Sequence, residues 1–128
     1  MPHDPGSPAA WMQFAHSDLA LARQGVGPGV LFETLCFHAQ QAAEKALKAV
    51  LIHYGIPILK IHSIERLVDL LPPAIQRPPI LIESAILTDY AVTFRYPGDE
   101  DPLTETEYHE AVRIAIAVVA WVETLIQE

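Results

Sequence analysis

The chain has 128 residues, of which 51% are hydrophobic and 19% are charged, and this composition fits one domain with a packed core and excludes global disorder. Its 8 basic and 16 acidic residues give a formal net charge of −8, which disfavours nonspecific nucleic-acid binding because phosphate backbones repel such a surface. Cys36 is the single cysteine, which cannot form an internal disulfide, and the first residues lack the pattern of a signal peptide, so we expect a reducing, cytoplasmic location.

Glycine and proline divide the first half of the chain into two predicted helices. Ser7 followed by Pro8 is typical of an N-cap and a first helical position, which predicts a helix over about residues 8–24. Glycines and a proline within residues 25–29 interrupt it, and a second helix is expected over about residues 30–54, with Gly55 as its C-terminal stop. One face of this second helix is apolar and is expected to enter the core: Leu31, Leu35, Ala39, Ala42, Ala46, Ala49 and Val50.

Three more helices are expected in the second half. Residues 63–71 form a short one that ends at a pair of prolines, and residues 80–94 show apolar side chains at helical spacing. Thr104 and Glu107 can form a capping box, which opens a last helix that runs to about residue 126. Together these elements predict an all-α, antiparallel up-and-down bundle of four to five helices over residues 9–128, preceded by a flexible segment over residues 1–8.

Two of these helices carry more apolar surface than one core face requires. Residues 114–122 are apolar almost all round, yet this run is much shorter than the roughly 20 residues that cross a bilayer, so no membrane span is expected. On the second helix one side mixes apolar and polar residues: Phe37, Gln41, Glu44, Lys48, Leu51 and Ile52. Either another helix of the same bundle covers this second side or another molecule does. We expect a homodimer, because small bundles often pair symmetrically.

The most distinctive segment is the alanine-rich stretch over residues 36–49. Glu44 and Lys48 in it are four residues apart in the favourable order for a helical ion pair. His38 and Lys45 lie two turns apart at the edge of the apolar face, where they could hold a phosphate or a partner's carboxylate. The alternative is an ordinary boundary histidine beside a lysine whose stem packs while its head stays in water.

A second segment of interest is Arg95-Tyr96 followed by a Pro-Gly turn. An arginine at a helix end beside an aromatic ring offers a rigid fork of donors and a stacking platform, which suits a phosphate or a base. The alternative is that Arg95 pairs with helix-end carbonyls or with Asp89, and that Tyr96 packs.

These segments occur in an order that resembles a known family. The chain resembles the HEPN domain (higher eukaryotes and prokaryotes nucleotide-binding domain) from about residue 11 to residue 126. The segments that carry the resemblance are residues 17–22, residues 38–48, the His-Ser-Ile of residues 62–64 and the Arg-Tyr-Pro of residues 95–97. The resemblance implies an up-and-down helical bundle that commonly dimerises. It also implies frequent pairing with a minimal nucleotidyltransferase encoded alongside, often as a toxin–antitoxin system.

Many members of the wider HEPN group are metal-independent ribonucleases, whose signature is an arginine followed after about four to six residues by a histidine that moves protons. The arginine stabilises the charged phosphorane. Arg95 falls where the signature arginine is expected, but Glu100, Asp101 and Pro102 occupy the histidine positions. His109 is the first histidine that follows, and it lies outside the spacing.

We therefore expect a HEPN-type protein without catalysis of its own, which forms a homodimer and binds a minimal nucleotidyltransferase or a nucleotide. The candidate ligand- or partner-binding residues are His38, Gln41, Lys45, Lys48, Arg95 and Tyr96. The alternative is an endoribonuclease toxin that uses Arg95, His109 and Tyr96. The chain has no metal-ligand spacing and no phosphate-binding glycine loop, so no metal and no cofactor are expected.

Overall fold

The computed structural model describes residues 6–25, 27–58, 60–90 and 102–126. Its elements are α1 (Pro8–Ala22), α2 (Phe32–His53), α3 (Ile64–Asp69), α4 (Pro79–Glu83), α5 (Ile86–Tyr90) and α6 (Glu105–Ile126). No strand occurs in this described part of the chain, and the all-α prediction is confirmed. Most of the segment predicted to be flexible, residues 1–8, lies outside the described residues.

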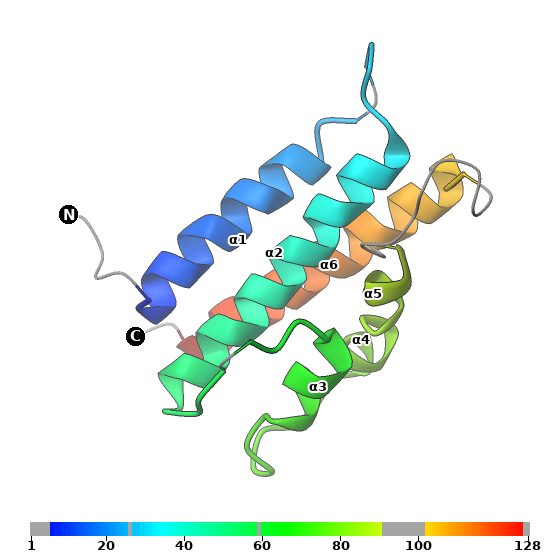
Figure 1. Ribbon diagram of the computed structural model, residues 1–128. Coiled ribbons are helices and arrows are strands. Elements are labelled where there is room, and N and C mark those ends of the chain that lie inside the picture. Colours follow the sequence, from blue (N-terminus) through cyan, green and yellow to red (C-terminus); the bar gives the residue numbers. More distant parts are fainter. Residues whose placement is uncertain (1–5, 26, 59, 91–101, 127–128) are drawn as a thin grey trace.

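Three long helices and one arm of short helices build the bundle (Figure 1). α1 and α2 run in opposite directions, and α6 packs against both of them, parallel to α2. Between α2 and α6 the short helices α3, α4 and α5 lead the chain back to the end at which α6 begins. The path is therefore the predicted up-and-down one, although its third arm is broken into short pieces.

The helix ends that have a capping signal in the sequence lie where the signal predicts. The Ser7 hydroxyl accepts the Ala10 N–H at 3.1 Å, at the start of α1. After α2, Gly55 has a φ of +75°, which L side chains rarely adopt, and the Ile56 N–H closes the turn on the Leu51 carbonyl at 2.9 Å. The capping box of α6 forms as predicted, because the Glu107 N–H donates to Thr104 Oγ1 at 3.1 Å and the Thr104 N–H donates to Glu107 Oε1 at 2.9 Å.

The prediction of a single helix over residues 80–94 is wrong for residues 80–90, the part of this range that the structure describes. It is interrupted between α4 and α5, where the buried Ser84 hydroxyl donates to the Leu81 carbonyl at 2.7 Å. The backbone there tightens to i→i−3 hydrogen bonds, such as the one from the Leu87 N–H to the Ser84 carbonyl at 3.0 Å. Residues 91–94 of the predicted helix lie outside the described residues.

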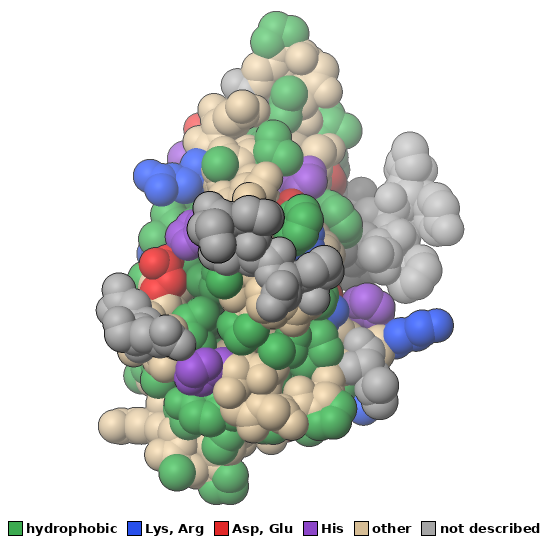
Figure 2. Space-filling model, turned by 90° about the vertical axis from the view of Figure 1, so that its left-hand side faces the viewer, with side chains coloured by type: hydrophobic (Ala, Val, Ile, Leu, Met, Phe, Trp, Pro, Cys, Tyr) green, Lys and Arg blue, Asp and Glu red, His purple; other side chains and the backbone are tan. Residues whose placement is uncertain are grey.

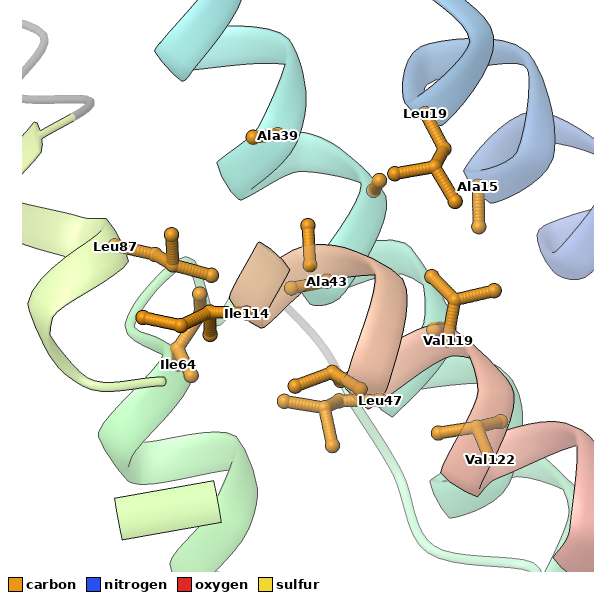
Figure 3. Packing of buried hydrophobic residues seen from close by; sticks show 14 of the residues in the cluster. Ala15, Leu19, Ala39, Ala43, Leu47, Ile64, Leu87, Ile114, Val119 and Val122 are labelled. Atoms are coloured by element: carbon orange, nitrogen blue, oxygen red, sulfur yellow. The ribbon is translucent and has the colours of Figure 1, made fainter. Parts of the chain in front are cut away.

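Small side chains let α2 lie close to its neighbours at the centre of the bundle. All five alanines of α2 are fully buried: Ala39, Ala42, Ala43, Ala46 and Ala49. Ala15 and Leu19 of α1 and Val119 of α6 point into the same core (Figure 3). The prediction that Leu31 enters the core is wrong, because Leu31 is the N-cap of α2 and its side chain is exposed.

Most of the apolar surplus expected on α2 and α6 is covered by the bundle itself. Leu51 is fully buried, and so are most of the large side chains of residues 114–122. Of the two alternatives that the sequence left open, the bundle itself covers these residues, because α2 and α6 each pack against several elements at once. Phe37 of α2 and Ile116 of α6 remain 36% exposed. Among the described helices, none has the length and hydropathy to span a membrane.

Candidate functional site

The first polar cluster joins α1 to α2, and we call it the Asp18 cluster (Asp18, His38 and Lys45). The His38 Nδ1–H donates to Asp18 Oδ1 at 2.9 Å, and the Lys45 ammonium donates to Asp18 Oδ2 at 2.5 Å. The Asp18 side chain is almost buried, whereas His38 and Lys45 keep about a quarter of their side-chain surface exposed. One carboxylate therefore holds two cation-forming groups at the boundary between α1 and α2.

The second polar cluster lies farther along α2, and we call it the Glu44 cluster (Gln40, Glu44, Lys48 and His62). The Glu44 carboxylate accepts hydrogen bonds from Gln40 Nε2 at 2.7 Å, Lys48 Nζ at 2.9 Å and His62 Nδ1 at 3.3 Å. The side chains of Glu44 and Lys48 are only 4% and 6% exposed. The Lys48 ammonium also lies 5.5 Å from the centroid of the Trp11 ring. The pair predicted from its i, i+4 spacing thus forms in the protein interior.

The structure separates the residues that the sequence grouped as one ligand site. His38 and Lys45 belong to the Asp18 cluster, and Lys48 belongs to the Glu44 cluster. Gln41 adjoins the Glu44 cluster, because its Nε2 donates to Gln40 Oε1 at 2.9 Å. Each cation already faces a carboxylate of its own chain, which weakens its attraction for a phosphate.

The residues of the alternative catalytic site are described only in part. Arg95 and Tyr96 lie outside the described residues. His109 is exposed on the first turns of α6, with its Nε2 3.6 Å from Glu105 Oε2. In the described ranges no group of three or more histidine, cysteine or acidic side chains is arranged to hold a metal ion.

Sequence reasoning missed the acidic partners that come from other elements. Asp18 is 20 residues from His38 and 27 from Lys45, so no spacing within one helix indicates these contacts. Two histidines likewise meet acids from distant parts of the chain: His62 Nδ1 lies 3.3 Å from Glu44 Oε2, and His16 Nε2 lies 3.0 Å from Glu123 Oε1. A usable signal for Asp18 was its position as the one acidic residue of α1.

The described residues include two groups of exposed apolar side chains. The α1–α2 face consists of Phe14, Leu21 and Phe37, all exposed, around the Asp18 cluster. The α4–α6 face consists of Ile82 on α4 with Ile116 and Ala120 on α6, all exposed, and the half-buried Trp121 of α6. Hydrophobic side chains cover much of the side of the molecule on which α1 lies, and charged side chains are few there (Figure 2).

A family model described as HEPN domain matches residues 9–125. Among solved structures, the chain is similar to TT1696 from Thermus thermophilus, with 31% sequence identity, a TM-score of 0.80 and coverage of 93% of this chain and 98% of that one. It is also similar to ST0689, an archaeal HEPN homologue, with 32% identity, a TM-score of 0.75 and coverage of 94% and 98%. Among curated proteins none matches significantly.

Proposed function

The chain belongs to the HEPN domain family, and we propose that it functions as a homodimer that pairs with a minimal nucleotidyltransferase and has no catalysis of its own. The observation that carries the dimer is the α4–α6 face, where Ile82 is 80% exposed. An isoleucine that is moved from water into an interface contributes about 1.5–3 kcal/mol. A large apolar side chain that is this exposed, with further exposed apolar side chains on a neighbouring helix, is typical of a protein–protein contact.

The α4–α6 face is continuous across two elements. Glu83 Oε1 lies 3.0 Å from Arg113 Nη2, which holds the end of α4 against α6. Ile82 directly precedes Glu83, and Ile116 follows Arg113 by about one helical turn, so both isoleucines flank this ion pair. The solvent side of α6 then stays uncharged as far as Ala120 and Trp121.

The α4–α6 face is also complementary to itself. An open groove of about 560 Å³ is lined in part by Pro79 at the start of α4, three residues before Ile82, and by Trp121 and Leu125 of α6. In a two-fold dimer each copy offers the same patch, so a projecting side chain and a neighbouring hollow can both be used twice. Glu83 and Arg113 bring equal and opposite charges to this face, so two copies do not repel each other here although each chain has a net charge of −8.

The two polar clusters favour a protein partner over a free nucleotide. A nucleotide site needs cations that are available to phosphate oxygens, whereas Lys45 and Lys48 are bound to Asp18 and Glu44. The absence of catalysis is proposed because no histidine follows Arg95 at the spacing that ribonucleases of this group use.

Co-expression with a minimal nucleotidyltransferase, taken from a neighbouring gene where one encodes it, tests the pairing. The proposal expects both proteins to co-purify in a fixed ratio, and the isolated chain to leave a labelled RNA intact. Cleavage of that RNA by the wild type, lost in Arg95→Ala, would establish the ribonuclease instead. A monomeric chain at micromolar concentration that ignores the nucleotidyltransferase would refute the proposal.

A further inference from the structure

The described residues that line the groove, over residues 74–79 and the end of α6, include one cation, Arg77. Its Nη1 donates to the Ile75 carbonyl at 3.3 Å, and its Nη2 donates to the carbonyls of Val68 and Leu71 at 3.2 Å and 2.8 Å. Bonds to three backbone oxygens restrict a guanidinium to one orientation, because its donors form a rigid planar fork. Arg77 is therefore a pre-positioned cation and not a freely moving surface side chain.

The positive charge of Arg77 is not neutralised by a carboxylate of the described residues. None of their ion pairs involves Arg77, and none of those that line the groove is acidic. Glu123 of α6 has its Oε1 3.0 Å from His16 Nε2 of α1. A guanidinium stays charged at every pH at which proteins are folded. Arg77 thus differs from Lys45 and Lys48, each of which pairs with a buried carboxylate.

Apolar side chains form much of the remaining wall of the groove. The half-buried indole of Trp121 and the side chain of Leu125 contribute from α6, and Pro78 and Pro79 contribute at the start of α4. The volume of about 560 Å³ lies within the range of about 300–1,000 Å³ that is typical of small-molecule sites. The groove therefore offers an apolar surface with an aromatic ring beside one fixed positive charge.

A carboxylate matches the charge of this groove better than a phosphate does. The Nε–H of Arg77 and one N–H of its Nη1 bind no acceptor of the described residues, so they remain for a charged ligand atom. A phosphate monoester carries a charge of about −1.5 to −2 at pH 7, and one guanidinium leaves part of that charge uncompensated. The chain, whose net charge is −8, repels this excess. A singly charged carboxylate leaves no excess.

We propose that this groove is a binding site for a small organic acid, which has one carboxylate and an aromatic or branched apolar body. Arg77 receives the carboxylate, and the body packs on Trp121, Leu125 and the two prolines. The consequence for association rests on the proposed function, in which the second copy uses the same groove. Occupancy by the acid then excludes the projecting side chain of the second copy and weakens the homodimer.

Phenylpropionate and its neutral amide, phenylpropionamide, are the probes for this site, because they share a ring and a shape and differ in charge. Isothermal titration of the full chain is expected to give a Kd at least about tenfold lower for the acid than for the amide. Inorganic phosphate and AMP are expected to bind at least about tenfold more weakly than the acid. Chemical-shift changes in an amide NMR spectrum are expected at residues 74–79 and around Trp121.

Two substitutions of Arg77 separate its charge from its bonds to the backbone. Arg77→Lys and Arg77→Gln both lose the planar fork that binds the three carbonyls, but only Arg77→Lys keeps a positive charge. The ratio of the Kd of the amide to that of the acid is expected to fall to about one in Arg77→Gln and to stay higher in Arg77→Lys. Arg66→Gln, which removes an exposed arginine of α3 outside the groove lining, is the matched control and keeps the wild-type ratio. If circular dichroism shows that a variant does not fold, the wild-type comparison of acid and amide decides alone.

The outcomes distinguish this inference from the proposed function. Equal affinity for acid and amide, no binding of either, tighter binding of phosphate or AMP, or a wild-type Kd ratio in Arg77→Gln would each overturn the site. Saturating phenylpropionate is expected to raise the dimer Kd in sedimentation equilibrium at least about tenfold, and an unchanged dimer Kd would refute the shared use of the groove. A monomeric chain that binds the acid through Arg77 would refute the homodimer and keep the site. A dimer that binds no acid would do the reverse.

Discussion

Replacement of Lys48 by methionine is expected to destabilise the fold through the charge that it leaves behind. Methionine keeps most of the lysine stem, so little cavity forms and the main change is the loss of the ammonium. The Glu44 carboxylate then stays buried with Gln40 and His62 as its remaining hydrogen-bond partners. A buried carboxylate that loses its cation is strongly destabilising, because the low-dielectric interior cannot replace water around the charge.

The magnitude follows from the burial of both partners. Breaking a buried ion pair costs about 3–5 kcal/mol, and the hydrogen bonds from Gln40 and His62 place Lys48→Met near the lower end, at about 3 kcal/mol. For an m-value of about 2 kcal/mol/M this lowers the urea midpoint by about 1.5 M. Urea unfolding followed by circular dichroism at several protein concentrations measures this loss and separates it from any effect of association.

Two controls make the result specific to the buried pair. Lys60→Met removes an exposed lysine and is expected to change the free energy of unfolding by less than about 0.5 kcal/mol. The double variant Glu44→Gln/Lys48→Met removes both charges and is expected to recover most of the stability. A loss below about 1 kcal/mol in Lys48→Met, or a double variant no more stable than the single one, would refute the reasoning.

Three further substitutions test the packing, a cross-helix hydrogen bond and a turn, each by the free energy of unfolding in urea. Leu47→Ala is expected to cost about 2–5 kcal/mol, because the fully buried side chain lies at the centre of the core, and a cost near zero would contradict that position. Tyr108→Phe is expected to cost about 1 kcal/mol through the hydrogen bond from its hydroxyl to the Ala22 carbonyl, 2.5 Å long; an unchanged stability would argue against that bond. Gly55→Ala is expected to cost about 1 kcal/mol, because the backbone there has a φ of +75°, which strains an L side chain. Steric clash does not contribute, since an added Cβ has nothing within 4 Å. A stabilised Gly55→Ala protein would show that the turn is not left-handed.

Local signals in the sequence were enough to place most helix ends. Ser7, Gly55 and Thr104 each act through their own backbone or through a residue three positions away, so the caps could be predicted without knowledge of the fold. The break at Ser84 could not be predicted from the sequence. The Ser84 side chain is fully buried and its hydroxyl donates to the Leu81 carbonyl, and hydrophobic periodicity does not reveal either feature.

The candidate site shows the same division between local and long-range contacts. The Glu44–Lys48 pair follows from i, i+4 spacing within one helix, and it was predicted. The contacts of Asp18 with His38 and Lys45 depend on the alignment of α1 beside α2, which no single-helix pattern determines. For the same reason the sequence could not decide whether Leu51 is covered by the bundle or by another molecule.

Sedimentation equilibrium of the wild type and of Ile82→Glu tests the proposed homodimer most directly. The proposal predicts a wild-type dimer at micromolar concentration. In the variant each dimer loses the contact of the isoleucine side chain twice, once per copy. A loss of about 1.5 kcal/mol per copy weakens the dimer by about 3 kcal/mol, which raises its Kd by roughly a hundredfold. A wild type that stays monomeric, or a variant that dimerises as tightly as the wild type, would contradict the assignment of the α4–α6 face.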